Sequence, residues 1–190
     1  MKKIIVVLIL VLFLSGSSVG QSVSVYYDSR GYVTTYIEAA SQFKRLNYFG
    51  FVDYHTRPNR YFTRHILRCE LFKGLGVHAK YDLPYGFHGL GRFGIGYHIP
   101  VHKGWVQVIG YGLETDHRGA QLAIVWSIPI TKRIQSEGFL DRNWNPNVWI
   151  GEPQIVRQLK GSWAVLVEAR INQLERRAYG IAMGLRWKGR

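Results

Sequence analysis

The sequence contains a single cysteine, Cys69, among its 190 residues. An intramolecular disulfide is therefore impossible, and stability must come from packing and backbone hydrogen bonds. Long apolar runs are also missing, since the longest covers residues 4–14. That run falls well short of the roughly 20 residues that a membrane-spanning helix needs, so it is too short to anchor the chain.

The start of the chain instead has the three parts of a secretory signal. Lys2 and Lys3 are basic, residues 4–14 are apolar, and residues 15–20 are mostly small. No cysteine follows the apolar run, which excludes a lipoprotein signal. We predict a signal peptide over residues 1–20 and one domain over residues 21–190.

Acidic residues are scarce, because 12 Asp and Glu stand against 25 Lys and Arg and give a net charge of +13. Such a charge often indicates nucleic-acid binding. An exported chain, however, meets lipopolysaccharide phosphates and anionic solutes instead of a genome. We expect outer-membrane lipid and lipopolysaccharide as partners and no nucleic acid. A solvated basic surface without a specific partner is the alternative.

Beyond the signal, no segment has a sustained helical period, while β-branched and aromatic residues recur in short runs between Gly, Pro and Asn. This composition predicts an all-β fold. Reading the runs at period two predicts about twelve strands, over residues 22–28, 33–42, 47–54, 61–72, 75–82, 90–99, 105–115, 121–130, 134–141, 148–158, 162–172 and 179–187.

The connections between these strands alternate in length. Short basic connections occur at residues 44–46, 73–74, 100–104, 131–133 and 159–161. Mostly longer ones occur at 29–32, 55–60, 83–89, 116–120, 142–147 and 173–178. Tight periplasmic turns and longer extracellular loops are typical of a closed antiparallel up-and-down transmembrane β-barrel in the bacterial outer membrane.

The strand faces support this fold class, because one face of most strands is apolar. Residues 179–187 place Tyr, Ile, Met, Leu and Trp on one face and Gly, Ala, Gly and Arg on the other. Two strands, 105–115 and 148–158, do not alternate in this way. A soluble barrel has the same pattern turned inside out.

Aromatic residues favour the membrane barrel over the soluble one. They fall near strand ends on the apolar face, where the two interfaces of a bilayer require them. These residues are Tyr27, Tyr48, Tyr54, Trp149, Trp163, Tyr179 and Trp187.

The opposite face then lines a lumen and carries the candidate site residues. Charges this dense must pair or contact water, because a buried unpaired charge costs several kcal/mol. The lumen side chains are predicted to be Tyr26, Asp28, Tyr36, Glu38, Phe51, Asp53, Arg64, Arg68, Glu70, His78, Lys80, Asp82, Arg92, His98, Asp141, Glu152, Glu168 and Arg170. The lumen is either a narrow aqueous channel or a plugged ion-pair network.

One part of this lumen carries a sharper expectation. Inward residues on adjacent antiparallel strands lie close enough to couple. We expect one cross-strand charge network at the narrowest point, and we expect Arg68 to be part of it. Its members are predicted to be Asp53, Arg64, Arg68, Glu70, Lys80 and Asp82.

Signals for catalysis and for metal binding are weak. The seven histidines are scattered over loops and three strands, and none stands in a recognisable pairing with a serine. No His, Cys or Asp cluster has metal-ligand spacing. The glycines of residues 91–96 lie within a predicted strand without a following helix, so they do not form a phosphate loop. We expect no enzyme activity, metal or cofactor.

Several motifs, taken in order, resemble the Tsx-type family of nucleoside-specific channel-forming outer-membrane proteins, especially its short branch. The motifs are VYYD at residues 25–28, YVTTYIE at 32–38, FGFVDY at 49–54, CELF at 69–72, HAKY at 78–81, GFLD at 138–141, EPQ at 152–154 and GLRW at 184–187.

The resemblance implies a monomeric twelve-stranded barrel with a narrow pore that takes up nucleosides. Aromatic rings stack on a base, and polar groups bond to a ribose. It implies rings from Tyr26, Tyr36, Phe51 and Phe139, and acceptors from Asp28, Glu38, Asp53, Glu70, Asp141, Glu152 and Glu168. We therefore predict a narrow channel for small solutes. The alternatives are a non-conducting structural or adhesion barrel and, less favoured, a lipid-modifying barrel enzyme.

Overall fold

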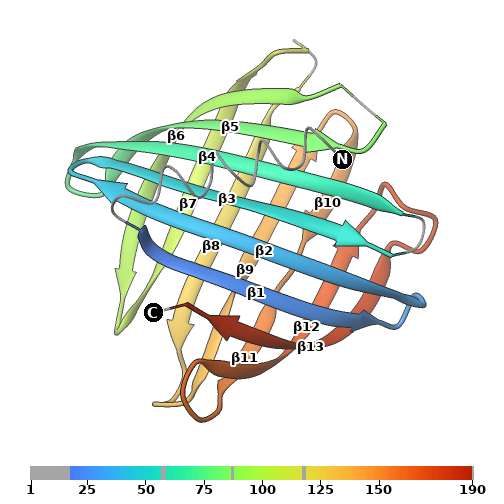
Figure 1. The fold of residues 1–190 in the computed structure, drawn as a ribbon. Helices are drawn as coiled ribbons and strands as arrows, with labels where there is room; N and C mark the ends of the chain where they lie inside the picture. Colours follow the sequence, from blue (N-terminus) through green and yellow to red (C-terminus); the bar gives the residue numbers. More distant parts are fainter. Residues whose placement is uncertain (1–17, 57–58, 87, 117–118, 190) are drawn as a thin grey trace.

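The structure, a computed structural model, describes residues 18–56, 59–86, 88–116 and 119–189 (Figure 1). Within these residues, no helix is long and apolar enough to span a bilayer. The strands are β1 (Ser18–Asp28), β2 (Tyr32–Phe43), β3 (Leu46–His55), β4 (Arg60–Phe72), β5 (Leu75–Pro84), β6 (Leu90–Val101), β7 (Gly104–Glu114), β8 (Gln121–Pro129), β9 (Ile134–Trp144), β10 (Asn147–Gly151), β11 (Gln154–Gln158), β12 (Trp163–Asn172) and β13 (Tyr179–Lys188).

All neighbouring strands pair antiparallel, and β13 pairs with β1 to close the sheet into a barrel. Both β10 and β11 pair with β9 on one side and β12 on the other. They continue one register, and the break between them falls at Pro153, which has no backbone N–H to donate. They are thus halves of one strand, and the barrel has twelve strands, as predicted from the sequence.

The predicted signal peptide lies almost entirely outside the described residues. Only Ser18–Gly20 fall within the structure, where they form the start of β1. The signal peptide and its cleavage site therefore stay predictions.

The exposure of β13 decides which face of the wall is apolar. Met183 is 63 % exposed on the outer surface, and the other outward residues of this strand are also large and apolar. Ala182 and Arg186 point inward and are 0 % and 3 % exposed. The barrel is therefore apolar outside and polar inside, the inverse of a soluble barrel and the arrangement of a transmembrane one.

The aromatic residues predicted for the membrane interfaces all lie on this outward face. Tyr27 and Tyr179 are each 66 % exposed, and Trp163 is 51 % exposed. Tyr48 is partly covered, because its hydroxyl hydrogen-bonds to Nδ1 of the outward His65 at 2.8 Å.

The predicted strand over residues 105–115 corresponds to β7, and its apolar and polar residues do not alternate because the strand contains a β-bulge. Arg92 pairs with Glu114 and Phe93 with Leu113, but Gly94 pairs with Tyr111. The extra residue reverses the face, so that Tyr111 is 1 % exposed inside the barrel and Leu113 is 69 % exposed outside. A simple period of two misses this reversal.

The β10–β11 strand has a truly mixed inner face. Val148 and Ile150 point inward beside Asn143 and Asp141, and further along the strand Gln154 pairs with Glu137. Apolar and polar residues thus alternate in blocks along the lumen instead of forming one polar face.

The two ends of the barrel differ. Short turns and both strand ends that carry the chain termini lie at one end, which we call the turn end (Figure 1). The longer connections lie at the opposite, loop end. The predicted loop at 142–147 is shorter than expected, because β9 extends to Trp144 and β10 begins at Asn147.

A charge placed on the outer wall tests whether this surface faces lipid. Met183→Arg, at the middle of β13, should lower the free energy of unfolding in a bilayer by about 2–4 kcal/mol, because the guanidinium would lie in hydrocarbon. Urea titration of the protein refolded in vesicles measures this. Met183→Leu is the control and should cost less than about 1.5 kcal/mol. A change of less than about 0.5 kcal/mol for arginine, usual on a water-facing surface, would contradict a lipid contact.

Candidate functional site

The interior of the barrel holds most of the buried charge in the described residues. The inward side chains gather into two networks, which we name after their central arginines. The Arg64 network consists of Arg64, Lys80, Asp82, Arg92, Glu114, Gln121, Asp141 and Asn143. The Arg170 network consists of Asp28, Arg30, Thr34, Asp53, His55, Glu168, Arg170 and Glu175.

Arg64 connects opposite walls of the barrel. Its Nε donates to Oδ1 of Asp82 on the adjacent strand β5 at 2.8 Å. Its Nη2 lies 3.0 Å from Oδ2 of Asp141, which belongs to β9. Because β5 to β8 lie between β4 and β9 in the sheet order, this second contact crosses the lumen.

Two more cations complete the Arg64 network. Lys80 hydrogen-bonds to Gln121 of β8 and lies 3.5 Å from Asp141, so it also spans the interior. Arg92 contacts Asp82 at 3.1 Å and Glu114 at 2.5 Å. The three cations match three carboxylates, and each side chain is less than a tenth exposed. Such burial is tolerated only because every charge is paired.

Aromatic rings surround these cations. The Arg64 guanidinium lies 4.9 Å from the centroid of the Phe139 ring and 5.5 Å from that of Phe62. The Lys80 ammonium lies 4.8 Å from the centroid of Tyr111. Ring faces attract cations, and their bulk excludes water, which strengthens the ion pairs at this level of the lumen.

The Arg170 network has an excess of carboxylates. Arg170 Nε lies 2.5 Å from Glu168 and 3.4 Å from Asp28, and its Nη1 donates to Thr34 Oγ1 at 3.0 Å. Asp53 and Glu152 are also close enough to Arg170 to interact with it electrostatically, and Arg30 is the only other arginine of this network. The wall formed by β1 to β3 and β11 to β13 is therefore the more acidic side of the lumen.

Three side chains contact one another in a row that resembles the nucleophile, base and acid of a catalytic triad. They are Thr34, His55 and Asp53. Thr34 Oγ1 lies 2.9 Å from His55 Nδ1, and His55 Nε2 lies 3.3 Å from Asp53 Oδ2. However, Thr34 is 0 % exposed, and Arg170 also bonds to its hydroxyl. A nucleophile must reach its substrate, so this arrangement supports packing better than catalysis.

A third set of contacts joins β13 to β1, β9 and β11. Arg186 donates to Ser24 Oγ at 3.1 Å and to Gln154 Oε1 at 2.7 Å, and it forms an ion pair with Glu137. The other inward residues of β13, which are Gly180, Ala182 and Gly184, are small and leave room for this side chain.

Aromatic side chains form a continuous row on the inner wall of β1 to β4. The ring centroids of Tyr26 and Tyr36 are 6.5 Å apart, and those of Tyr36 and Phe51 are 4.9 Å apart. Phe51 continues the row to Phe49 at 6.1 Å and to Phe62 at 5.8 Å. Asp53 and Glu38 lie on the same wall, so rings and carboxylates are adjacent.

All sixteen predicted ligand-binding candidates face inward, but they do not form one network. Arg64, Lys80 and Asp82 come together as expected, whereas Asp53 joins the Arg170 network instead. Among the other candidates, Glu38 accepts a hydrogen bond from Ser22, and Glu152 interacts with Arg170. The ring of Phe139 lies over the Arg64 guanidinium. The aromatic row contains Tyr26, Tyr36 and Phe51.

The expectation for Arg68 is wrong. Arg68 lies near the turn end, where it donates to the Gly74 carbonyl at 3.1 Å and lies 3.6 Å from Glu70. Its partner on the adjacent strand β5 is His78 and not a carboxylate. The register instead pairs Asp82 with Arg64, which lies four residues before Arg68 on the same face of β4. Arg64 takes the role that the sequence suggested for Arg68.

Several network members were missed in the sequence. Glu114 was hidden by the bulge in β7, and Gln121 and Asn143 carry no charge. His55 was predicted in a loop but is the last residue of β3. Arg186 lies on the face of β13 opposite the apolar one, and this alternation alone could have placed it in the lumen. Within the described residues, no group of His, Cys, Asp and Glu could hold a metal ion.

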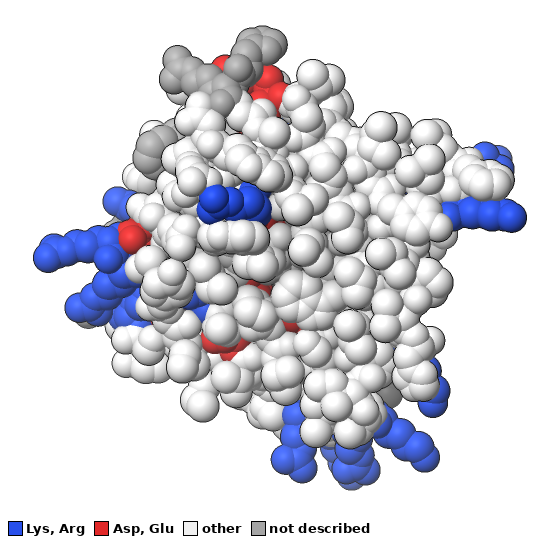
Figure 2. Space-filling view, turned by 180° about the vertical axis from the view of Figure 1, so that it is seen from behind, with Lys and Arg blue, Asp and Glu red and all other residues white. Residues whose placement is uncertain are grey.

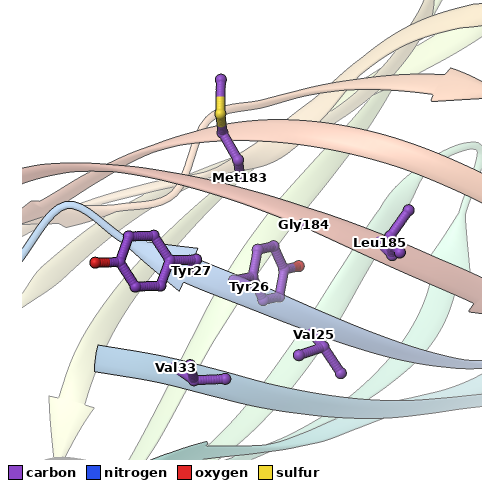
Figure 3. Close-up of a pocket in the computed structure, with 7 residues that line it drawn as sticks. All are labelled: Val25, Tyr26, Tyr27, Val33, Met183, Gly184 and Leu185. Carbon is purple, nitrogen blue, oxygen red and sulfur yellow. The ribbon is translucent and has the colours of Figure 1, made fainter. Parts of the chain in front are cut away.

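A shallow hollow of about 410 Å³ lies outside the barrel, on the seam where β13 meets β1. Figure 3 shows Val25, Tyr27, Met183 and Leu185 around Gly184, which has no side chain to fill the space. Its lining is apolar and it opens toward the lipid-facing surface. It therefore belongs to the outer wall and not to the lumen.

Comparison with known proteins identifies the fold class. No family model and no curated protein match this sequence. The KdgM porin in complex with disordered oligogalacturonate matches with a TM-score of 0.61 and 10 % identity, over 89 % of this chain and 98 % of that chain. A second KdgM porin structure matches with a TM-score of 0.60. Outer membrane phospholipase A from Escherichia coli matches with a TM-score of 0.58 and 11 % identity, over 90 % and 96 % of the chains.

The chain therefore has the fold of a bacterial outer-membrane β-barrel. The apolar outer wall and the polar interior agree with this class, which the sequence predicted. Identities of 10 to 11 % show the fold alone, so the resemblance to the Tsx-type family stays a prediction.

The geometry predicts unequal roles for the two arginines. Arg64→Ala should reduce the free energy of unfolding by about 3–5 kcal/mol, because it leaves Asp82 and Asp141 buried without a partner. Arg68→Ala should cost about 1 kcal/mol, the value of a single hydrogen bond. Thermal unfolding followed by the heat-dependent gel shift measures both. Equal losses would show that Arg64 is not held in a dry network.

Proposed function

We propose that this protein is a narrow outer-membrane channel for small solutes, constricted by the Arg64 network. The observation that carries the proposal is the cross-lumen contact between Arg64 and Asp141, set in a barrel with a charged interior and an apolar exterior. Within the described residues, the constriction consists of side chains that belong to the strands of the wall. Rotation of Arg64 and Lys80 would open a path lined by carboxylates without a change in the wall.

The fold supports a channel, since two of the matching structures are porins. The interior supports a small solute. Asp53 is paired across the strands with Tyr36, and Glu38 is paired with Phe51, at the centre of the aromatic row. A planar ring of a solute could stack on Tyr36 or Phe51 while hydroxyl groups of the same solute bond to the carboxylates. A nucleoside has both features, and we propose this solute class on that ground together with the sequence resemblance.

The alternative function is a non-conducting structural barrel. It is favoured by the pairing of every cation in the Arg64 network and by the burial of those side chains. A closed barrel needs such pairing for stability, whereas a channel needs the network to open. Conductance separates these two functions.

Planar-bilayer recordings of the purified, folded protein test the channel. We expect small, discrete current steps for the parent protein. Arg64→Ala should increase the conductance and shift ion selectivity toward cations, because a fixed positive charge leaves while Asp82 and Asp141 remain.

The control for this experiment is Arg176→Ala, which removes an exposed charge from the connection between β12 and β13 and should leave selectivity unchanged. Flat traces for both the parent and Arg64→Ala, with folding verified on a gel, would reject the channel and support the structural barrel.

The solute class has its own test. Adenosine added to one side should reduce the ionic current if a base stacks in the lumen. Phe51→Ala removes the centre of the aromatic row and should weaken this block by about 5- to 150-fold, since stacking contributes about 1–3 kcal/mol per base. Ribose alone is the matched probe, because it has the hydroxyl groups of adenosine but lacks the aromatic base. Current that adenosine and ribose affect equally, in both proteins, would exclude recognition of the base.

A further inference from the structure

The turn end carries a rim of basic residues that the channel function does not use. We call it the basic rim. Its members are exposed or half-buried and belong to every short turn and to the end of β13: Lys44, Arg45, Lys73, Lys103, Lys132, Arg133, Lys160 and Lys188. None of these described turns contains Asp or Glu. Glu70 reaches one of them from the inner wall, where it accepts a hydrogen bond from the Gly74 N–H and lies 3.6 Å from Arg68.

The loop end is different, because cations and carboxylates are mixed there. Asp116 and Glu175 lie in its connections, and Glu175 pairs with Arg30 at 2.7 Å. In Figure 2, Lys and Arg side chains project from the lower right edge without Asp or Glu beside them, whereas red and blue atoms occur together on the left. A broad white band separates the two ends.

Most parts of the rim combine a cation with an exposed apolar residue. Phe43 precedes Lys44 and Phe72 precedes Lys73, and each of these rings is 65 % exposed. Leu159 precedes Lys160, Trp187 precedes Lys188 and Ile130 lies two residues before Lys132, and all three are exposed. The turn with Lys103 is the exception, because Val101 beside it is half-buried. The ammonium groups of Lys44 and Lys73 fold back to 5.6 and 5.4 Å from the ring centroids of the preceding phenylalanines.

Turn geometry does not explain these lysines. Lys44 and Lys73 have φ angles of 53° and 34°, in the left-handed region where Gly and Asn are favoured. Lysine at these positions has a conformational cost that asparagine would reduce. An interaction outside the chain accounts for a cation at such positions better than the turn itself does.

We propose that the basic rim binds the phosphates of anionic phospholipid headgroups around the whole circumference of the barrel. The exposed apolar residues beside most of these cations would lie among the acyl chains next to the headgroups, and the cations would reach the headgroup layer. A ring of separate sites fits a lipid leaflet, because one small solute cannot contact turns on opposite sides of the barrel.

The position of the chain ends identifies the lipid source. Both ends of the barrel sequence lie at the turn end, together with the short turns (Figure 1). In outer-membrane barrels the short turns face the periplasm, where the leaflet consists of phospholipid and not of lipopolysaccharide. The partner is therefore anionic phospholipid, of which phosphatidylglycerol is the probe.

The test compares the full chain refolded in phosphatidylcholine vesicles with and without phosphatidylglycerol. Phosphatidylglycerol should raise the thermal midpoint of the parent, and added salt should abolish the rise. K44N/K73N should lose part of the rise, and K44N/K73N/K103N/K160N should lose most of it. Asparagine suits the backbone at Lys44 and Lys73, so folding in phosphatidylcholine should not be impaired.

The matched control is R176N/R177N, which removes two exposed cations from the loop end and should keep the full rise. A rise that survives in the quadruple variant, or that the control loses equally, would overturn the proposal. So would an equal rim-dependent rise in vesicles that contain lipopolysaccharide in place of phosphatidylglycerol. If the quadruple variant does not fold, the salt dependence of the rise in the parent and in K44N/K73N still tests the proposal. A rise that added salt does not reduce, or that is equal in the two proteins, would overturn it.

Discussion

Successive side chains on a β-strand point to opposite faces, and this one constraint determines most of the molecule. Once the outer face of a closed barrel is apolar, nearly every charge in the strands must lie in the lumen. Charges in so narrow a space need partners, which lie on the same wall for Arg92 and on both walls for Arg64. Arg64 therefore pairs with Asp82 beside it and with Asp141 across the interior. The ion-pair networks are a consequence of the inverted distribution of apolar residues.

The two walls of the lumen differ in charge. In the Arg64 network cations and carboxylates balance, whereas around Arg170 the carboxylates are in excess. The balanced network spans the interior, and the acidic wall adjoins the aromatic row of Tyr36 and Phe51. Under the function proposed above, constriction and solute contact therefore involve different side chains, so that each can be altered separately.

Much of this fold could be predicted from period-two patterning, because lipid contact imposes a strict rule on alternate residues. The rule succeeded for β13, where every outward residue is large and apolar. It failed at the bulge in β7, since one extra residue reverses the face and no local signal beyond Gly112 accompanies it. The inward location of the site residues was predictable. Their partners were not, because Arg64 meets Asp141 only through closure of the barrel, and Arg68 lost its expected partner through the register of β4 and β5.

The contacts that cross the lumen also have a mechanical consequence. A barrel wall of single thickness resists stretching along its hydrogen bonds but flattens readily into an ellipse. Arg64 with Asp141, and Arg186 with Glu137, tie together strands that are not neighbours in the sheet. Flattening the barrel would change the distance between these strands and would therefore break or strain the two ion pairs. Side chains inside the barrel thus oppose a change of its cross-section, in addition to the hydrogen bonds of its backbone.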